Sequence, residues 1–235
     1  MRKIWTKLAA VAFAVVPAVA FGATLHVTPE GAGSMDGSDW ENACAGIQAA
    51  VDVAEAAFLA GEEVPDILVG DGTYGRVVVT NDFALDVRSA NGAAAAIIDG
   101  GGTNNCVRCY ANWRYPKSPT FTGFTLRNGN ARASGNWNEV DGGGAAGGTL
   151  VDCIIEDCVG SDGGGTIQSD SARCIILRCK ATGWGGGGVE EGTHRNTLIY
   201  DCETYVAVIY DATLYNCTVA DTAADSGYYG VCYNS

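Results

Sequence analysis

The second half of the chain repeats. Glycine triplets at 142–144, 163–165 and 186–188 each open a segment of the same layout, and residues 206–208 open a fourth. A cysteine column lies eleven residues after the first triplet position and a second column lies five residues further on: Cys153, Cys174, Thr197 and Cys217 in the first, and Cys158, Cys179 and Cys202 in the second. The four segments start 21, 23 and 20 residues apart. This period predicts a solenoid, in which a coil buries its apolar side only when a neighbouring coil stacks on it.

The columns indicate what each coil contains. Two residues after the first cysteine column lies an apolar column of Ile155, Ile176, Ile199 and Val219, and two residues is the side-chain period of a strand. Two polar columns should face water: Asp152, Arg173, Asn196 and Asn216 in one, and Asp157, Arg178, Asp201 and Asp221 in the other. The repeats are rich in Gly, Thr, Val, Ile and Cys rather than in helix formers. We therefore expect stacked parallel strands that rise about 4.8 Å per coil, with turns at the glycine triplets and at the second cysteine column.

The N-terminus predicts export. Residues 1–22 combine a basic start, an apolar run from Leu8 to Val16, Pro17 and small residues near Ala20, which is the pattern of a signal peptide. The apolar run is short for a membrane span, so no transmembrane helix is expected in the mature chain. Cleavage would leave 11 basic and 27 acidic residues. This balance argues against a nucleic-acid partner, because phosphate binding requires clustered Lys and Arg.

Residues 23–62 do not repeat and are interpreted as an N-terminal cap. Ser38 to Glu41 has the form of a capping box, apolar residues then recur at helical spacing, and Gly61 follows as a stop. We expect one helix near residues 39–60, which would cover the open end of the stack. Residues 63–235 would then form the coils.

The order of several short motifs resembles that of secreted bacterial right-handed parallel β-helix proteins of the pectate-lyase-like fold: Trp40-Glu41-Asn42-Ala43, Gly72-Thr73-Tyr74, Ile97-Ile98-Asp99-Gly100 and 122–129. The glycine-rich coils are also similar to polymorphic outer-membrane protein repeats. The resemblance implies an all-β, right-handed parallel β-helix solenoid of roughly six or seven coils with an N-terminal capping α-helix. It does not fix the function, because this architecture includes polysaccharide lyases, hydrolases, tailspikes and adhesins.

The cysteines leave two alternatives open. An exported chain with ten cysteines favours disulfides, whereas equivalent positions on parallel strands keep their Cβ atoms farther apart than the roughly 3.8 Å of a disulfide, which favours stacked free thiols. Cys106-x-x-Cys109 is interpreted as a local disulfide or as two loop cysteines that do not bond to each other. A zinc site is disfavoured, since a structural zinc site needs four ligands. No metal site and no cofactor is expected, although an isolated calcium ion at Asp162 stays open.

The candidate binding residues are aromatic and acidic. Trp113, Trp137 and Trp184 lie in expected loops and could stack on sugars or contact a protein, or could simply pack the loops. Glu190 and Glu191 form, with His194 and Arg195, the one cluster that mixes acid, imidazole and guanidinium, and His194 shares a column with Leu150 and Leu214, which favours a partly packed ring.

No catalytic constellation can be assigned from the sequence. We therefore expect a secreted, cell-surface or outer-membrane-associated scaffold that is adhesin-like or binds an extracellular glycan or a surface protein. The alternative is a polysaccharide lyase or glycoside hydrolase that acts on an extracellular polysaccharide.

The last residues align with an earlier coil. Residues 229–235 match 206–212 without gaps, and in that earlier coil the strand beginning at Thr213 follows directly. This alignment predicts that the chain stops before its last strand and that the natural solenoid continues beyond Ser235.

Overall fold

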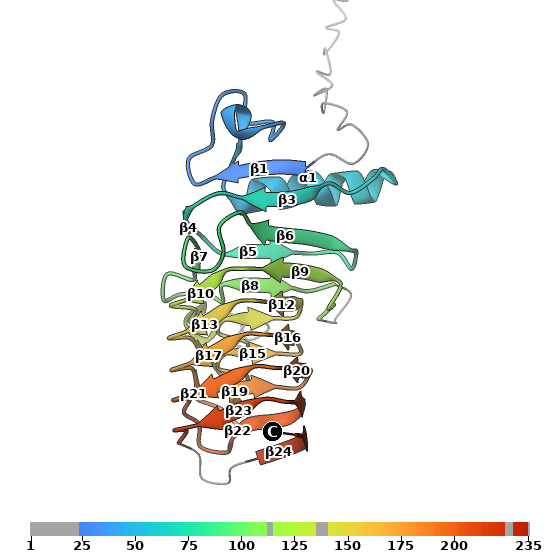
Figure 1. Cartoon of the computed structure of the whole chain (residues 1–235). Coiled ribbons are helices and arrows are strands. Elements are labelled where there is room, and N and C mark those ends of the chain that lie inside the picture. Colours follow the sequence, from blue (N-terminus) through green and yellow to red (C-terminus); the bar gives the residue numbers. More distant parts are fainter. Residues whose placement is uncertain (1–23, 112–114, 135–140, 224–227, 235) are drawn as a thin grey trace, which may run out of the picture.

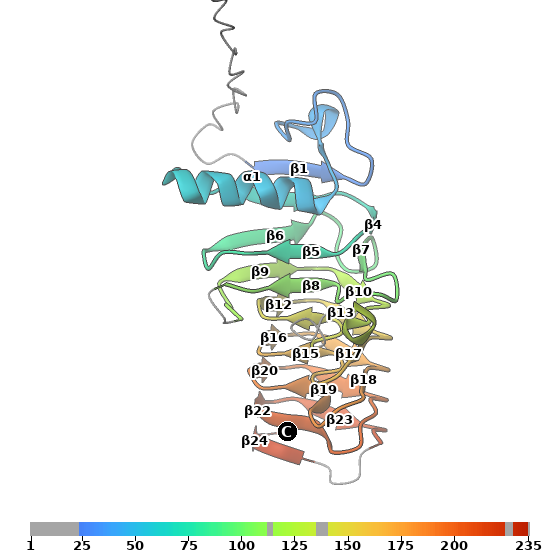
Figure 2. The same ribbon diagram turned by 180° about the vertical axis from the view of Figure 1, so that it is seen from behind.

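The computed structural model describes residues 24–111, 115–134, 141–223 and 228–234. These residues form a tall column of stacked parallel strands, with one helix at the N-terminal end (Figure 1). The same arrangement is seen from behind in Figure 2, where α1 (Ile47–Ala60) lies alongside β1 (Thr24–Thr28). The expected all-β, parallel and solenoid-like architecture is therefore confirmed.

The strands form ladders that run along the column. The largest sheet has two limbs that meet at β22 (Ala207–Tyr215), which is long enough to belong to both. One limb contains β2 (Cys44–Ala45), β1, β3 (Asp66–Val69), β6 (Leu85–Ser89), β9 (Pro119–Thr122), β12 (Thr149–Val151), β16 (Asp170–Ala172) and β20 (Thr193–Arg195). The other limb contains β5 (Val77–Val79), β8 (Val107–Cys109), β11 (Ala145–Ala146), β15 (Thr166–Ile167) and β19 (Gly186–Glu190).

A seven-stranded sheet forms another side of the column, and a short two-stranded sheet lies at the following corner. The seven strands are β4 (Gly72–Tyr74), β7 (Ala96–Asp99), β10 (Thr125–Arg127), β13 (Ile154–Glu156), β17 (Ile175–Leu177), β21 (Leu198–Tyr200) and β23 (Thr218–Ala220). The corner pair is β14 (Val159–Gly160) and β18 (Lys180–Ala181). In chain order a coil thus runs through one strand of each ladder, for example β15, β16, β17 and β18.

The register of the stack follows the apolar column. Ile155 pairs with Ile176, Ile176 with Ile199, and Ile199 with Val219 on successive strands. The three isoleucines are completely buried. The predicted register is confirmed, and the column continues toward the N-terminus through Leu126, Ile98 and Tyr74.

The polar columns are turn residues. Asp152, Asp157, Arg173 and Arg178 adopt φ angles of +52° to +54°, and their counterparts Asn196, Asp201, Asn216 and Asp221 adopt +47° to +52°. Asn and Asp tolerate this left-handed conformation, whereas it is strained for arginine. Each arginine is held by a bidentate contact to the carboxylate one coil earlier, with 2.7 Å between Arg173 Nε and Asp152 Oδ1. The sequence predicted exposure at both polar columns and a turn at the second cysteine column, but it did not predict the left-handed turn at Asp152 and Arg173.

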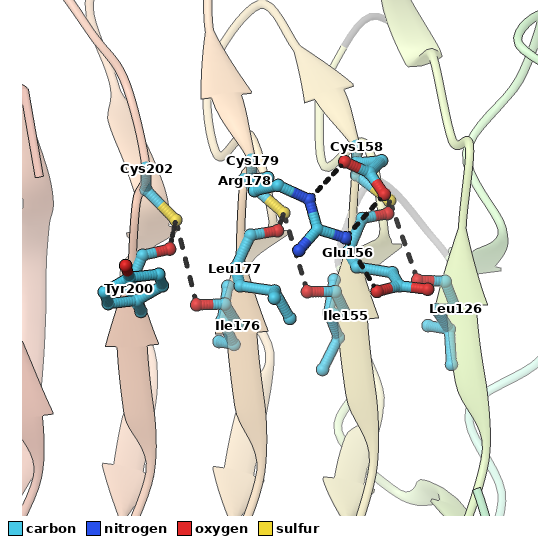
Figure 3. A network of polar contacts seen from close by, with 11 residues as sticks. Leu126, Ile155, Glu156, Cys158, Ile176, Leu177, Arg178, Cys179, Tyr200 and Cys202 are labelled. Carbon is cyan, nitrogen blue, oxygen red and sulfur yellow. Dashed lines mark hydrogen bonds and ion pairs between the residues drawn. The ribbon is translucent and has the colours of Figure 1, made fainter. Parts of the chain in front are cut away.

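The second cysteine column closes these turns. In Figure 3 the sulfur of each cysteine points to the carbonyl two residues earlier: Cys158 to Glu156 at 3.1 Å, Cys179 to Leu177 at 3.4 Å and Cys202 to Tyr200 at 3.4 Å. The first column shows the same bond, and Thr197 Oγ1 makes it to the Arg195 carbonyl at 3.1 Å. A small side chain with one donor after a left-handed residue makes this bond in both columns, which explains why Thr can replace Cys.

All ten cysteines carry free thiols, and nine of them are buried. A local disulfide between Cys106 and Cys109 is therefore not formed. Cys106 directly precedes β8, and Cys109 is the last residue of that strand. The Cys106 sulfur lies 3.2 Å from the Arg127 carbonyl oxygen. A Cβ added at Gly129 would lie 3.1 Å from the same sulfur. Gly129 occupies the second cysteine column, so Cys106 fills the space that this glycine leaves.

The helix is shorter than the sequence predicts. It begins at Ile47 rather than at residue 39, because Gly46 adopts φ 80° and ψ 158° and interrupts the helical backbone. Asp39 caps a separate short 3-10 helix, η1 (Trp40–Asn42), by accepting a hydrogen bond from the Asn42 backbone N–H. Gly61 ends α1 in the left-handed conformation, as expected. A second short 3-10 helix, η2 (Ala131–Ser134), precedes the glycine-rich coils.

The last strand lies in a different register from the one predicted. β24 (Tyr228–Tyr233) pairs with β22 such that Tyr229 lies beside Tyr210 and Tyr233 beside Tyr215. The alignment of 229–235 on 206–212 is therefore wrong by four residues, and the strand that was expected to be missing is formed by 231–233. A bulge between Tyr210 and Ala212 absorbs one further residue, which is why an ungapped comparison could not find this register. Continuation beyond Ser235 stays a prediction.

Candidate functional site

The predicted site residues fall into three groups. Trp113 and Trp137 lie outside the described residues. Trp184 lies just before β19 and is 84% exposed, and Glu190 ends the same strand. Glu191 is in a left-handed turn and accepts a hydrogen bond from Gln168 Nε2 at 3.0 Å. Trp184 and Glu190 are thus brought to one corner of the column, and Glu191 is held at the next turn.

We call this corner the glycine corner, and define it by the triplets 142–144, 163–165 and 186–188 with the residues that precede them. The triplets run side by side, and the Gly164 N–H donates to the Gly186 carbonyl at 2.8 Å. They also pass closely over the isoleucine column, since a Cβ added at Gly165 would lie 2.7 Å from Ile176 Cγ2. Glycine is required here because the backbone and the core side chain leave no room for a methyl group.

Two carboxylates flank Gly185 at this corner. Asp162 Oδ1 accepts hydrogen bonds from the backbone N–H groups of Trp184 at 2.9 Å and Gly185 at 2.8 Å. Glu190 Oε2 accepts one from the Gly186 N–H at 3.3 Å. A Cβ at Gly185 would clash with Glu190 Oε2 and lie 2.7 Å from Asp162 Cβ. Asp162 therefore fixes the backbone that carries the exposed Trp184 ring, and Glu190 lies close to the same backbone at Gly185 and Gly186.

Burial and the neighbouring negative charges both disfavour ionisation of the Glu190 carboxyl group. Burial is the largest cause that raises the pKa of Glu190, to about 7, and the charges of Asp162, Asp141 and Glu191 add to it. Burial likewise raises the pKa of Asp141, with a further contribution from Asp162. The hydrogen bond from the Gly186 N–H lowers the pKa of Glu190 and so offsets part of this rise. Near neutral pH, Glu190 is thus a carboxyl that can either donate or accept a proton.

Two aromatic rings project from adjacent coils at this corner. Lys180 pairs with Glu203 and Gly186 with Ala207, so Trp184 and Tyr205 lie in the connections between these pairs on adjacent coils. Tyr205 is 66% exposed, and Thr204 beside it donates a hydrogen bond from Oγ1 to the Gly185 carbonyl at 3.0 Å. The sequence alignment placed residue 206 beside Gly186, one residue too early, and so it missed this pairing. A bulge between Gly186 and Val189 shifts the register.

A hollow of about 440 Å³ lies next to Tyr205. An ion pair between Lys180 Nζ and Glu203 Oε2, at 2.9 Å, lines it together with hydroxyl groups. The full lining consists of Lys180, Ala181, Glu203, Thr204, Tyr205, Thr222 and Ala223. The hollow therefore combines an aromatic ring, a cation, a carboxylate and hydroxyls on a solvent-accessible surface.

His194 is not part of this surface. It is completely buried between coils, more so than the partly packed ring that the sequence predicted. Its Nδ1 lies 2.8 Å from Ser171 Oγ, its Nε2 lies 3.1 Å from the Glu191 carbonyl, and Ser171 Oγ lies 3.1 Å from Thr197 Oγ1. Burial lowers the pKa of His194 to about 4. The triad resembles a nucleophile and base in composition, but its burial makes it a polar layer of the core.

Metal binding and membrane spanning have no support among the described residues. In residues 24–111, 115–134, 141–223 and 228–234, no group of three or more His, Cys, Asp and Glu side chains is arranged to hold a metal ion. No helix in the same ranges is long and apolar enough to cross a membrane. An isolated calcium ion at Asp162 stays a prediction.

No family model and no curated protein sequence matches this chain. The function must therefore be argued from the geometry. The sequence named Trp184 and Glu190 as candidate binding residues and Asp162 only as a possible calcium ligand, and it missed Tyr205 and the Lys180–Glu203 pair. Asp162 had a signal, since it directly precedes a glycine triplet, but its contacts with Trp184 and Gly185 only appear once the coils are stacked.

Proposed function

We propose that this protein is an exported glycan-binding scaffold, a right-handed parallel β-helix that presents a binding surface at the glycine corner. The observation that carries the proposal is the pair of exposed rings, Trp184 and Tyr205, on adjacent coils beside a polar hollow. Exposed aromatic residues that lie together on a rigid framework are typical of interaction sites, and their faces suit the apolar faces of sugar rings.

The spacing of the rings supports an extended ligand. Adjacent coils are separated by about 4.8 Å, which is the distance between neighbouring strands. We therefore expect one oligosaccharide to reach both Trp184 and Tyr205. The Lys180–Glu203 pair and the threonine hydroxyls of the hollow can exchange hydrogen bonds with sugar hydroxyls. The backbone beneath Trp184 is fixed by Asp162, so little conformational freedom is lost on binding.

The test is a glycan array probed with the labelled mature protein and with a Trp184→Ala/Tyr205→Ala variant. We expect the wild type to bind a set of glycans, and we expect the binding signal of the double variant to be at least tenfold weaker. Tyr200→Ala is the matched control, since Tyr200 is an exposed tyrosine on β21 of another sheet, and it should bind as the wild type does. Absence of glycan binding, or equal binding by the double variant, would contradict the proposal.

A second candidate function, glycan hydrolysis, is favoured by one observation. Glu190 has a pKa raised to about 7 beside the carboxylate of Asp162, and such a pair can divide the roles of proton donor and anion. The test is release of reducing ends from the glycans bound on the array. Hydrolysis that Glu190→Gln abolishes while binding persists would favour the enzyme, whereas binding without products favours the scaffold.

A further inference from the structure

A second surface lies on the limb of the large sheet that contains β12, β16 and β20. A hollow of about 270 Å³ opens there between two outward-facing columns. It is lined by Thr149, Asp170, Ser171, Ala172, Thr193 and Arg195. Ala172 pairs with Arg195 on the next strand and with Val151 on the previous one, and its small side chain leaves the space that forms the hollow.

Arg195 stands out among the cations of this region. Five of the six other lysines and arginines in the described residues 115–223 form an ion pair with a carboxylate: Lys117 with Asp170, Arg127 with Asp99, Arg173 with Asp152, Arg178 with Asp157, and Lys180 with Glu203. The sixth, Arg132, donates to the Thr182 hydroxyl. Arg195 is exposed and, within the described part of the chain, its guanidinium has neither an ion pair nor a hydrogen bond.

The Arg195 guanidinium is nevertheless held in place. Its Cζ lies 4.1 Å from the centroid of the Tyr215 ring, one coil further on. Tyr215 in turn stacks on Tyr233, with ring centroids 4.9 Å apart and an angle of 8° between the rings. An arginine on an aromatic face keeps its N–H donors free at the edge of the guanidinium plane. Arg195 is therefore preorganised to receive an oxyanion.

The other side of the hollow offers hydrogen-bonding groups of a different kind. Asp170 accepts from Lys117 Nζ at 2.7 Å and from the Thr193 backbone N–H at 2.8 Å. Thr149 and Thr193 contribute hydroxyls to the lining. A ligand that fills the hollow would thus meet one guanidinium at one end, and a carboxylate and hydroxyls at the other.

We propose that this hollow binds a sugar residue carrying a single anionic group, either a carboxylate or a sulfate ester, with the anion on Arg195 and the sugar hydroxyls toward Asp170 and the threonines. The size of the hollow lies just below the roughly 300–1,000 Å³ of small-molecule sites and suits one sugar ring. The formal net charge of the chain, −13, repels densely charged polyanions, so the ligand carries isolated rather than contiguous charges. The site lies on a different face from the glycine corner and does not depend on the proposed function.

The experiment is a calorimetric or NMR titration of the full chain with five probes: glucuronic acid, glucose 6-sulfate, glucose, inorganic sulfate and polygalacturonate. We expect one of the two anionic sugars to bind at least tenfold more tightly than both glucose and inorganic sulfate, and polygalacturonate to bind more weakly per charge than the single sugar. The two anionic sugars distinguish a carboxylate from a sulfate ester.

Two variants test the assignment. Arg195→Gln removes the guanidinium, and Ala172→Leu fills the hollow while leaving Arg195 in place, so each should weaken binding at least tenfold. Arg173→Gln removes an exposed arginine in the turn after β16 that is already paired with Asp152, and it should bind as the wild type does. The proposal is overturned if neither anionic sugar binds at millimolar concentration, if glucose or sulfate alone binds equally well, or if folded Arg195→Gln and Ala172→Leu proteins keep wild-type affinity.

Discussion

Replacement of His194 by leucine should remove a large part of the acid sensitivity of this fold. His194 is completely buried, between Ser171 on one coil and Leu214 on the next. Its column contains Leu150 and Leu214, so a leucine fits the space. Ser171 Oγ keeps Thr197 Oγ1 as a neighbour at 3.1 Å after the change. The variant is therefore expected to fold.

The magnitude follows from the difference in pKa between the folded and unfolded states. Burial lowers the pKa of His194 to about 4, whereas an unperturbed histidine in the unfolded chain has a pKa of about 6.5. Since the unfolded state binds the proton more readily, the stability contributed by neutral His194 is fully present above about pH 6.5 and is lost as the pH falls toward 4. Between pH 7.5 and pH 4.5 this loss is about 2.5 kcal/mol.

The assay is equilibrium unfolding in urea at pH 7.5 and pH 4.5 for both proteins. Carboxyl groups such as Glu190 titrate in both, so their contribution cancels in the comparison. We expect the wild type to lose about 2.5 kcal/mol more than His194→Leu over this interval. An equal loss in the two proteins would show that His194 is not buried in its neutral form, and would refute the reasoning.

Three further predictions concern the stack. The free energy of unfolding of Cys174→Thr in urea should stay within about 1 kcal/mol of the wild-type value, because Thr197 already makes the same turn bond. Cys174→Val should be about 1 kcal/mol less stable than Cys174→Thr. Equal stability of the two variants would argue against the bond. Gly165→Ala should cost about 1–3 kcal/mol since its Cβ would lie 2.7 Å from Ile176 Cγ2, while Gly75→Ala, where no atom lies within 4 Å, should be nearly neutral. Alkylation without reductant should modify only Cys232 rapidly in the native protein and all ten cysteines in denaturant, and fewer than ten in denaturant would reveal disulfides.

Much of the stacking could be predicted because it depends on spacing alone. The isoleucine column repeats without gaps, so Ile155, Ile176 and Ile199 could be placed in register from the sequence. The left-handed turns could not, because Arg173 and Arg178 are unusual there and are stabilised by Asp152 and Asp157 one coil away. Such contacts exist only after the coils have stacked.

The errors arose where the repeat is irregular. A bulge in β19 shifts the pairing of Gly186, a bulge in β22 shifts the pairing of β24, and an ungapped alignment cannot detect a bulge. The helix start was misplaced because Trp40 and Ala43 continue the helical spacing by coincidence, while Gly46 breaks the backbone. At the glycine corner, Trp184 and Glu190 could be chosen by residue type, but Asp162 and Tyr205 depend on pairing across coils.

The most direct test of glycan binding at the glycine corner is a titration of one array-selected oligosaccharide against the wild type, the Trp184→Ala and Tyr205→Ala single variants, and the double variant. If one glycan contacts both rings, each single variant should weaken the affinity by about five- to tenfold or more, as expected for loss of an aromatic contact of about 1–1.5 kcal/mol, and Tyr200→Ala should leave it unchanged. Unchanged affinity in both single variants and in the double variant would contradict the account.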